Sequence, residues 1–185
     1  MAQPQIDLEA LAKDVRYLKD RADISDAIHR YTRGVDRLDF ELAQTAYHPD
    51  AVDDRGAFTG SPAAFMDWLK PHLSGAGGTS HNISNVTIEL DGDQAHAESY
   101  VIYHVWMPDG ASVVIGGARY IDRLERREGV WAIMHREALM DFIFRGPTTP
   151  LQPNSMIGAR DKSDRSYLRP LEPTPDAKQR LQSGA

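Results

Sequence analysis

Four long β-rich runs joined by tight turns make up most of the second half of this sequence. The turns read DGD, PDG and REG, and the runs that they join read HNISNVTIEL, AHAESYVIYHVWM, ASVVIGGARYIDRLER and VWAIMHREALMDFIF. Turns this short join antiparallel neighbours, because a parallel crossover needs a dozen or more residues. The runs therefore predict an antiparallel sheet of four long strands.

Helical periodicity precedes these strands. Apolar residues recur at helical spacing from Ile6 to Leu18 and again from Ile24 to Leu38, which predicts two amphipathic helices. A third, short helix is expected from Phe40 to Tyr47. His48-Pro49 should end it, because a proline disfavours helix in the residue before it.

A short strand and one more helix stand between these helices and the long strands. The strand is expected within AVDDRGAFTG, and the helix within SPAAFMDWLKPHL, where Ser61 is a good cap and Pro62 suits the first helical position. This order of elements predicts an α+β fold in which a curved antiparallel sheet wraps around the N-terminal helices. Such a sheet leaves room for a cone-shaped cavity.

Composition narrows the classes of partner. The chain has 185 residues, of which 41% are hydrophobic, enough for one domain with a sizeable core. Its net charge of −6, with basic and acidic residues interspersed, gives no basic stripe, so we expect no nucleic-acid partner. The absence of cysteine excludes thiol catalysis, thiolate metal sites and disulfides. Without an apolar run of membrane-spanning length or a signal-like start, we expect a cytoplasmic protein with no membrane partner.

The C-terminal residues differ from the rest of the chain. From residue 146 to 185 the sequence is rich in proline and charge and lacks periodicity. We therefore expect a domain at 1–145 and a C-terminal arm at 146–185, which wraps the domain or lies across a partner subunit. The arm is expected to fray at AKQRLQSGA.

Asp36 occupies an unfavourable place in its predicted helix. It follows two helical turns of apolar residues, near a C-terminal end where the macrodipole disfavours a negative charge by roughly 0.3–1 kcal/mol. A partner that offsets this cost is expected. Tyr31, on the apolar stripe of the same helix, also needs a partner for its hydroxyl if it is buried.

Three further residues could carry chemistry. His81 begins a strand whose two faces are both mixed, as at the mouth of a pocket, although an exposed strand-end histidine fits the pattern as well. His104 lies in mid-strand among aromatic residues, either as a core histidine or as an acid or base in a pocket. Arg136 shares a strand face with small and apolar residues, where a charge needs a carboxylate or a bound anion unless it lies at a surface edge.

Three segments together resemble the SnoaL-like branch of the nuclear transport factor 2-like superfamily. They are RYTRGVDRLDFELAQTAYHPDAVDD, SHNISNVTIELDGDQAHAESYV and GGARYIDRLERREGVWAIMHR, within residues 10 to 145. The resemblance implies an α+β cone-shaped barrel, commonly dimeric or trimeric. Scytalone dehydratase, hexachlorocyclohexane dehydrochlorinase and the bile-acid dehydratases of this branch pair a helix aspartate with a strand histidine. Asp36 and His81 match those positions.

Other positions carry parts of the same resemblance. Tyr31 matches a tyrosine that precedes the aspartate by five residues in the bile-acid dehydratases, and His104 matches a second strand histidine in scytalone dehydratase. Arg136 corresponds loosely to an arginine of several members. The cysteine of the dehydrochlorinase is absent here, so halide elimination is not favoured.

The expected chemistry follows from a carboxylate that holds an imidazole. If Asp36 accepts a hydrogen bond from one nitrogen of His81, it fixes the tautomer and leaves the other nitrogen as a base. Tyr31 or His104 could then give a proton to a departing oxygen, and Arg136 could stabilise an enolate-like or phenolate-like intermediate. We therefore expect a cofactor-independent lyase that eliminates water from a hydrophobic hydroxylated aromatic or polycyclic molecule. Deformylation of a lignin-derived diarylpropane, known in this superfamily, is a specific alternative.

Aromatic side chains are expected to line the substrate cavity, namely Tyr100, Trp106, Trp68 and Phe142. Three other classes remain open: an isomerase or polyketide-type cyclase with the same aspartate and histidine, a non-catalytic binding protein, and an enzyme whose metal is held by His81, His104 and Asp36. We expect neither metal nor cofactor, because acid–base chemistry already accounts for these three residues. A homo-oligomer, dimeric or trimeric, is expected from the resemblance.

Overall fold

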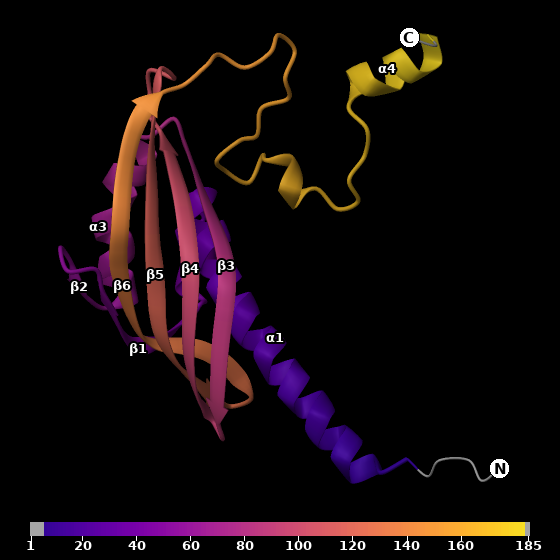
Figure 1. Ribbon diagram of the computed structural model, residues 1–185. Helices are drawn as coiled ribbons and strands as arrows, with labels where there is room; N and C mark the ends of the chain where they lie inside the picture. The colour runs from indigo at the N-terminus through magenta and orange to yellow at the C-terminus, as the bar shows by residue number, and fades with distance from the viewer. Residues whose placement is uncertain (1–5, 184–185) are drawn as a thin grey trace.

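The computed structural model describes residues 6–183. Helices come first along the chain and long strands follow, as the sequence predicts (Figure 1). The elements are α1 (Leu8–Asp36), α2 (Phe40–Gln44), β1 (Tyr47–Asp54), β2 (Thr59–Gly60), α3 (Pro62–Ser74), β3 (Gly78–Asp91), β4 (Gln94–Trp106), β5 (Ser112–Arg127), β6 (Val130–Pro147), the 3₁₀ turn η1 (Arg165–Tyr167) and α4 (Pro175–Ser183).

The strands form one curved, open sheet of six strands in the order β2-β1-β6-β5-β4-β3. All neighbours are antiparallel except β1 and β6, which are parallel. Helices α1 and α3 lie against one face of the sheet, and no helix within residues 6–183 covers the opposite face (Figure 1). The predicted α+β architecture, a curved sheet around N-terminal helices, is confirmed.

The two helices predicted before Leu38 are one continuous helix, α1, in the structure. Its N-cap is Asp7, whose side chain accepts hydrogen bonds from the backbone N–H groups of Glu9 and Ala10. The residues between the two apolar stripes, 19–23, include neither glycine nor proline, so nothing interrupts the helix there. The N-terminal half projects beyond the sheet, and Leu8 and Val15 on its apolar stripe are 73% and 56% exposed.

The short helix predicted up to Tyr47 ends earlier, at Gln44, and Tyr47 begins strand β1 instead. Two tertiary contacts outweigh the local helical pattern. The Tyr47 hydroxyl donates to buried Asp53 at 2.6 Å, and His48 Nε2 contacts the Glu125 carbonyl at 2.9 Å. Pro49, which lacks an N–H donor, falls where the pairing of β1 with β6 shifts register, so no regular ladder bond is lost there.

Strand β3 contains a β-bulge between Ser84 and Thr87. Asn85 adopts a positive φ of 48° within this bulge. The extra residue switches the inward parity of the strand, so that Thr79, His81 and Ile83 face the helices before it and Val86, Ile88 and Leu90 do so after it. The mixed faces of the sequence pattern arise because simple alternation is assumed across this bulge.

The C-terminal residues leave β6, loop outward and return past the end of α1 before α4 (Figure 1). Most of AKQRLQSGA, the segment expected to fray, belongs to helix α4 (Pro175–Ser183), which has no buried residue. The last two residues of that segment lie outside the described residues. No helix within residues 6–183 is both long and apolar enough to cross a membrane.

Candidate active site

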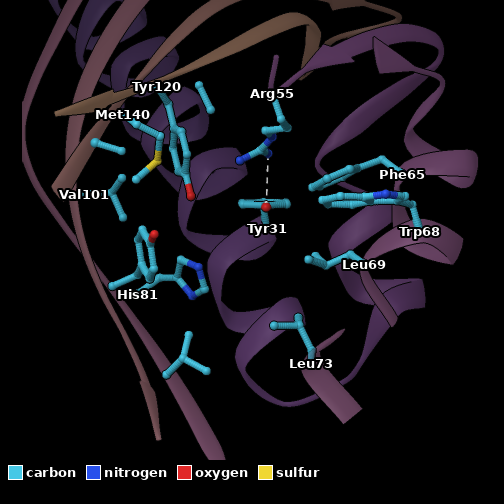
Figure 2. A pocket seen from close by; sticks show the side chains of 14 residues that line it. Tyr31, Arg55, Phe65, Trp68, Leu69, Leu73, His81, Val101, Tyr120 and Met140 are labelled. Carbon is cyan, nitrogen blue, oxygen red and sulfur yellow. Dashed lines mark hydrogen bonds between the residues drawn. The ribbon is translucent and has the colours of Figure 1, made fainter. Parts of the chain in front are cut away.

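A cavity of about 260 Å³ lies between the concave face of the sheet and helices α1 and α3 (Figure 2). Most of its wall is aliphatic or aromatic, and Arg55, His81 and three tyrosines supply its polar groups. The lining residues are Tyr31, Arg55, Phe65, Trp68, Leu69, Leu73, His81, Val101, Tyr103, Val105, Ala118, Tyr120, Ala138 and Met140. An apolar cavity with a few placed polar groups is typical of a small-molecule site.

Asp36 and His81 meet at one end of this cavity. Asp36 is the last residue of α1, and His81 lies in the first part of β3. His81 Nδ1 is 2.7 Å from Asp36 Oδ1, and the backbone N–H of His81 donates to Asp36 Oδ2 at 2.8 Å. The two side chains are only 12% and 13% exposed for His81 and Asp36 respectively. The structure thus provides the partner that the unfavourable place of Asp36 required.

The electrostatics of this pair favour an ionised carboxylate. Burial alone would raise the pKa of Asp36, but the hydrogen bonds and charge of His81 outweigh it and, with a hydrogen bond from Thr79, hold that pKa below its ordinary value. An ionised Asp36 accepts from Nδ1–H and so fixes the tautomer in which Nε2 carries the lone pair. No group in residues 6–183 hydrogen-bonds Nε2. The imidazole stacks on Tyr103, with ring centroids 5.8 Å apart.

Tyr31 and Arg55 also line the cavity, across from His81 (Figure 2). Arg55 donates to the Tyr31 hydroxyl at 3.1 Å, and its Nε and one terminal nitrogen also pair with Asp53. Burial raises the pKa of the Tyr31 phenol, and the charge of Arg55 opposes that shift. The guanidinium lies 4.5 Å from the centroid of the Phe65 ring, a cation–π contact.

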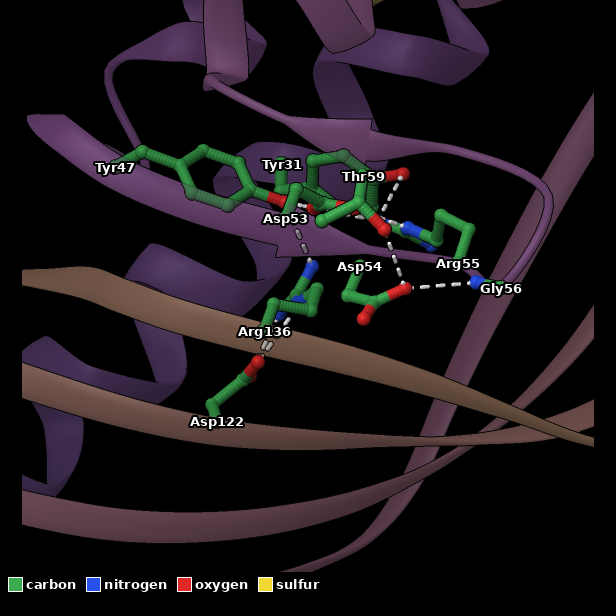
Figure 3. Close-up of polar contacts among 9 residues, drawn as sticks. All are labelled: Tyr31, Tyr47, Asp53, Asp54, Arg55, Gly56, Thr59, Asp122 and Arg136. Atoms are coloured by element: carbon green, nitrogen blue, oxygen red, sulfur yellow. Dashed lines mark hydrogen bonds and ion pairs between the residues drawn. The ribbon is translucent and has the colours of Figure 1, made fainter.

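Arg136 does not line the cavity, so the role predicted for it in stabilising an anionic intermediate has no geometric support. It is fully buried and forms a bidentate pair with Asp122, with Nε to Oδ1 at 2.7 Å and a terminal nitrogen to Oδ2 at 2.6 Å (Figure 3). Burial alone would lower the pKa of Arg136, but Asp122 raises it above the ordinary value. Arg136 therefore belongs to the buried polar network beneath the cavity.

His104, Tyr100 and Trp106 lie on the wrong face of β4 for the roles predicted for them. The inward residues of this strand are Ala95, Ala97, Ser99, Val101, Tyr103 and Val105, and the alternate set faces outward. Tyr100 and Trp106 are 43% and 39% exposed, and His104 stacks on Trp106 with ring centroids 6.0 Å apart. Small and aliphatic side chains are the ones that fit beneath the helices, so they mark the inner face.

Of the remaining two predicted cavity residues, one lines the cavity and the other does not. Trp68 of α3 lines the cavity and stacks on Phe65, with ring centroids 5.9 Å apart. Phe142 is half exposed and pairs with Gly117 on the outer face of the sheet. A bulge in β6 opposite Gly117 and Ala118 returns Met140 to the inner face.

Arg55, Tyr103 and Tyr120 are polar cavity residues that the sequence analysis missed. The signal for Arg55 is the alternation of Ala51, Asp53 and Arg55 in AVDDR. These three side chains share one face and point inward although two of them are charged. Opposite charges two residues apart on one strand face can neutralise each other and be buried together. Tyr103 was missed because its position depends on a residue of the neighbouring strand. Its ring stands over Gly116, where a Cβ would lie 2.2 Å from it.

A metal site built from His81, His104 and Asp36 does not fit this arrangement. His104 and His81 lie on opposite faces of the sheet, so their rings cannot converge with Asp36 on one ion. Within residues 6–183 no group of three histidine, aspartate or glutamate side chains is placed to hold a metal ion.

The fold and the cavity define a class of protein. It is an α+β domain in which a curved open sheet and N-terminal helices enclose a largely apolar small-molecule cavity with an aspartate–histidine pair at one end. The family model of the SnoaL-like domain matches residues 16–137, more than half of the chain. The chain belongs to the SnoaL-like family of the nuclear transport factor 2-like superfamily, as its sequence resemblance implies.

Relatives and solved structures agree with this assignment. An uncharacterized protein of Mycobacterium tuberculosis is 25% identical over 126 residues, which cover 66% of this chain and 86% of that protein. A type 2 hexachlorocyclohexane dehydrochlorinase is 22% identical, with a TM-score of 0.69 over 77% of this chain and 99% of its own. A scytalone dehydratase candidate from Novosphingobium aromaticivorans is 20% identical, with a TM-score of 0.65 over 78% and 99%. At these identities the structures show that the fold is shared.

Proposed function

We propose that this protein is a cofactor-independent acid–base lyase that acts on a hydrophobic, hydroxylated aromatic molecule. The observation that carries the proposal is the Asp36–His81 hydrogen bond of 2.7 Å at the edge of an apolar cavity. The dehydratase and dehydrochlorinase names of its structural neighbours are consistent with elimination chemistry.

His81 is the proposed base. With Nδ1–H held by Asp36, Nε2 removes a proton from an acidic carbon or a phenol of the substrate, and the carboxylate stabilises the imidazolium that forms. The buried, partly desolvated pair strengthens this interaction relative to water. A positioned base of this kind contributes typically ~10²- to 10⁴-fold to the rate.

Tyr31 and Arg55 are the proposed groups for the departing oxygen. The Tyr31 hydroxyl gives its proton to the leaving oxygen, so that one proton leaves the substrate and one is returned for each water released. Arg55 polarises this hydroxyl through its 3.1 Å contact and stabilises negative charge that develops on oxygen. This assignment replaces Arg136 and His104, which lie outside the cavity.

Arg55 also favours a neutral substrate. Asp53 already pairs with Nε and one terminal nitrogen of Arg55, so the pair has no net charge to offset a full anion. The other terminal nitrogen has no hydrogen bond within residues 6–183 and is available to a carbonyl, hydroxyl or developing phenolate oxygen. A cavity of about 260 Å³ lies just below the range of roughly 300–1,000 Å³ for drug-sized ligands. One or two aromatic rings fit it better than a steroid nucleus.

The specific reaction is elimination of water or release of formaldehyde from a diarylpropane-like diol. A panel of hydroxylated aromatic dimers, hydroxysteroids and polyketides, followed by mass spectrometry, separates these outcomes. We expect a substrate to lose one water or one formaldehyde with the wild type but not with Asp36→Asn. A product of unchanged mass would instead identify an isomerase or cyclase, and tight binding without turnover a binding protein.

We also infer a homo-oligomer, dimeric or trimeric, in which a second copy covers the outer face of the sheet. Rows of paired residues on β4, β5 and β6 place apolar side chains side by side there, including Ile102 with Gly117 and Phe142. Several of these side chains are 36–56% exposed, an arrangement typical of association surfaces. Light scattering after size exclusion is expected to give a mass above one chain for the wild type and a lower one for Phe142→Lys.

A further inference from the structure

Arg160, in the C-terminal arm, forms hydrogen bonds beside the candidate active site. Its guanidinium donates to the Leu73 and Ala76 carbonyls at 2.7 and 3.0 Å and to the Thr79 hydroxyl at 3.2 Å. A longer contact of 3.5 Å joins its Nε to the backbone carbonyl of Asp36. These partners come from the end of α1 and from the stretch between the end of α3 and the start of β3.

Arg160 lies where two helices end. Asp36 is the last residue of α1, and Leu73 and Ala76 flank the end of α3 at Ser74. The last carbonyls of a helix have no partner within it and carry its partial negative charge. A guanidinium with five donors is well suited to satisfy carbonyls from both helix ends at once.

The same guanidinium is linked to His81 through Thr79. Thr79 accepts a hydrogen bond from Arg160 at 3.2 Å, and its side chain helps to hold the pKa of the Asp36 carboxyl below its ordinary value. Thr79 is 5% exposed and lies two residues before His81, on the same face of β3. Thr79 therefore lies between Arg160 and the carboxylate that holds the imidazole.

Within residues 6–183, the other polar contacts between the arm and the end of α1 involve different residues. Asp164 lies 3.6 Å from Arg37, and the Tyr167 hydroxyl donates to Asp39 at 3.1 Å. The guanidinium of Arg33 stacks on the Tyr167 ring. These contacts attach the arm to the outside of α1 and to the turn after it. Arg160, in contrast, attaches the arm beside the Asp36–His81 pair.

We propose that the C-terminal arm is a working part of the active site, and that Arg160 is a positioning residue which holds the ends of α1 and α3 against the start of β3. Arg160 fixes where the Asp36 carboxylate meets His81 and places a positive charge beside that carboxylate. Its effect on rate rests on the proposed function, whereas its effect on the Asp36–His81 hydrogen bond does not.

The test uses the full chain with Arg160→Met, which keeps most of the aliphatic stem and removes every donor. The substrate-independent measurement is the NMR signal of the His81 Nδ1 proton, which a charge-assisted hydrogen bond to Asp36 shifts strongly downfield. We expect this signal in the wild type and its loss or marked upfield shift in Arg160→Met. Where turnover is measurable, kcat should fall by ~10- to 100-fold with KM changed less than about threefold, since small misplacements of catalytic groups can cost ~10²-fold.

Arg169→Met is the matched control, because Arg169 lies on the same arm and, among the residues that the structure describes, its side chain bonds only to the carbonyls of Ser166 and Leu168. It should keep both the NMR signal and kcat within about twofold of the wild type. An unchanged His81 signal in folded Arg160→Met would overturn the proposal, whether or not a substrate is known. A wild type without turnover on any substrate would contradict the proposed function and leave the NMR comparison valid.

Thr79→Val keeps the proposal falsifiable if Arg160→Met does not fold. Valine has the shape of threonine without the hydroxyl, so this variant removes the Thr79 partner of Arg160 beside the Asp36 carboxylate and leaves the carbonyl contacts in place. We expect a smaller shift of the same NMR signal in the same direction. A signal identical to that of the wild type would count against the link.

Discussion

Asp36 holds His81 by two separate groups, with Oδ1 on the ring Nδ1 at 2.7 Å and Oδ2 on the backbone N–H at 2.8 Å. Because both carboxylate oxygens are engaged by one residue, neither the carboxylate nor the imidazole can rotate without losing a hydrogen bond. The aspartate thus orients the imidazole and at the same time ties the end of α1 to β3.

Replacing either member of this pair should abolish most of the activity. Asp36→Asn and His81→Ala are each expected to lower kcat by at least ~10²-fold, because general-base catalysis is lost. His104→Gln is the control, since His104 lies on the outer face of the neighbouring strand. Steady-state kinetics on the true substrate would contradict the assignment if all three variants were equally active.

The Asp36 carboxyl should also make stability depend on pH. Its pKa is lower in the folded protein than its ordinary value, so its contribution to stability is complete above about pH 4 and is lost as the pH falls further. Urea midpoints measured between pH 2.5 and 6 should therefore fall less steeply for Asp36→Asn than for the wild type on the acid side. Parallel curves for the two proteins would mean that the carboxyl gains nothing from His81.

Removing the Tyr31 hydroxyl should separate catalysis from stability. Tyr31→Phe leaves the Arg55–Asp53 pair intact and is expected to cost ~1 kcal/mol of unfolding free energy but ~10²-fold in kcat. Tyr47→Phe is the matched control, because its buried hydroxyl donates to the same Asp53 but does not line the cavity. It should cost a comparable stability with little change in kcat, and a similar loss of rate in both variants would argue against Tyr31 as the acid.

The buried Arg136–Asp122 pair should matter for folding and not for chemistry. Arg136→Met leaves Asp122 fully buried without its partner and is expected to lower the free energy of unfolding by ~3–5 kcal/mol. Adding Asp122→Leu removes the orphaned charge and should restore a large part of that loss. Denaturant titrations test this, and a double variant no more stable than Arg136→Met would show that packing, not charge, accounts for the cost.

The sequence was informative about the Asp36–His81 pair and misleading about which face of β4 lines the cavity. Asp36 stood out because its place at a helix end needed a partner, and the resemblance pointed to His81. The face of β4 was misjudged because aromatic content was taken as the sign of the cavity, whereas the inner face is marked by small and aliphatic residues such as Ala97 and Val101. Arg55 could not be ranked above other arginines, since its importance depends on Tyr31, which is distant in sequence.

The bulge at Asn85 divides β3 into two segments of opposite side-chain parity. Ile88 and Leu90 face the core on one side of it, and His81 faces the cavity on the other. Deleting that single residue would turn either the imidazole or the core side chains to the outside. Insertions and deletions within this strand should thus be far less tolerated in this lineage than amino-acid replacements.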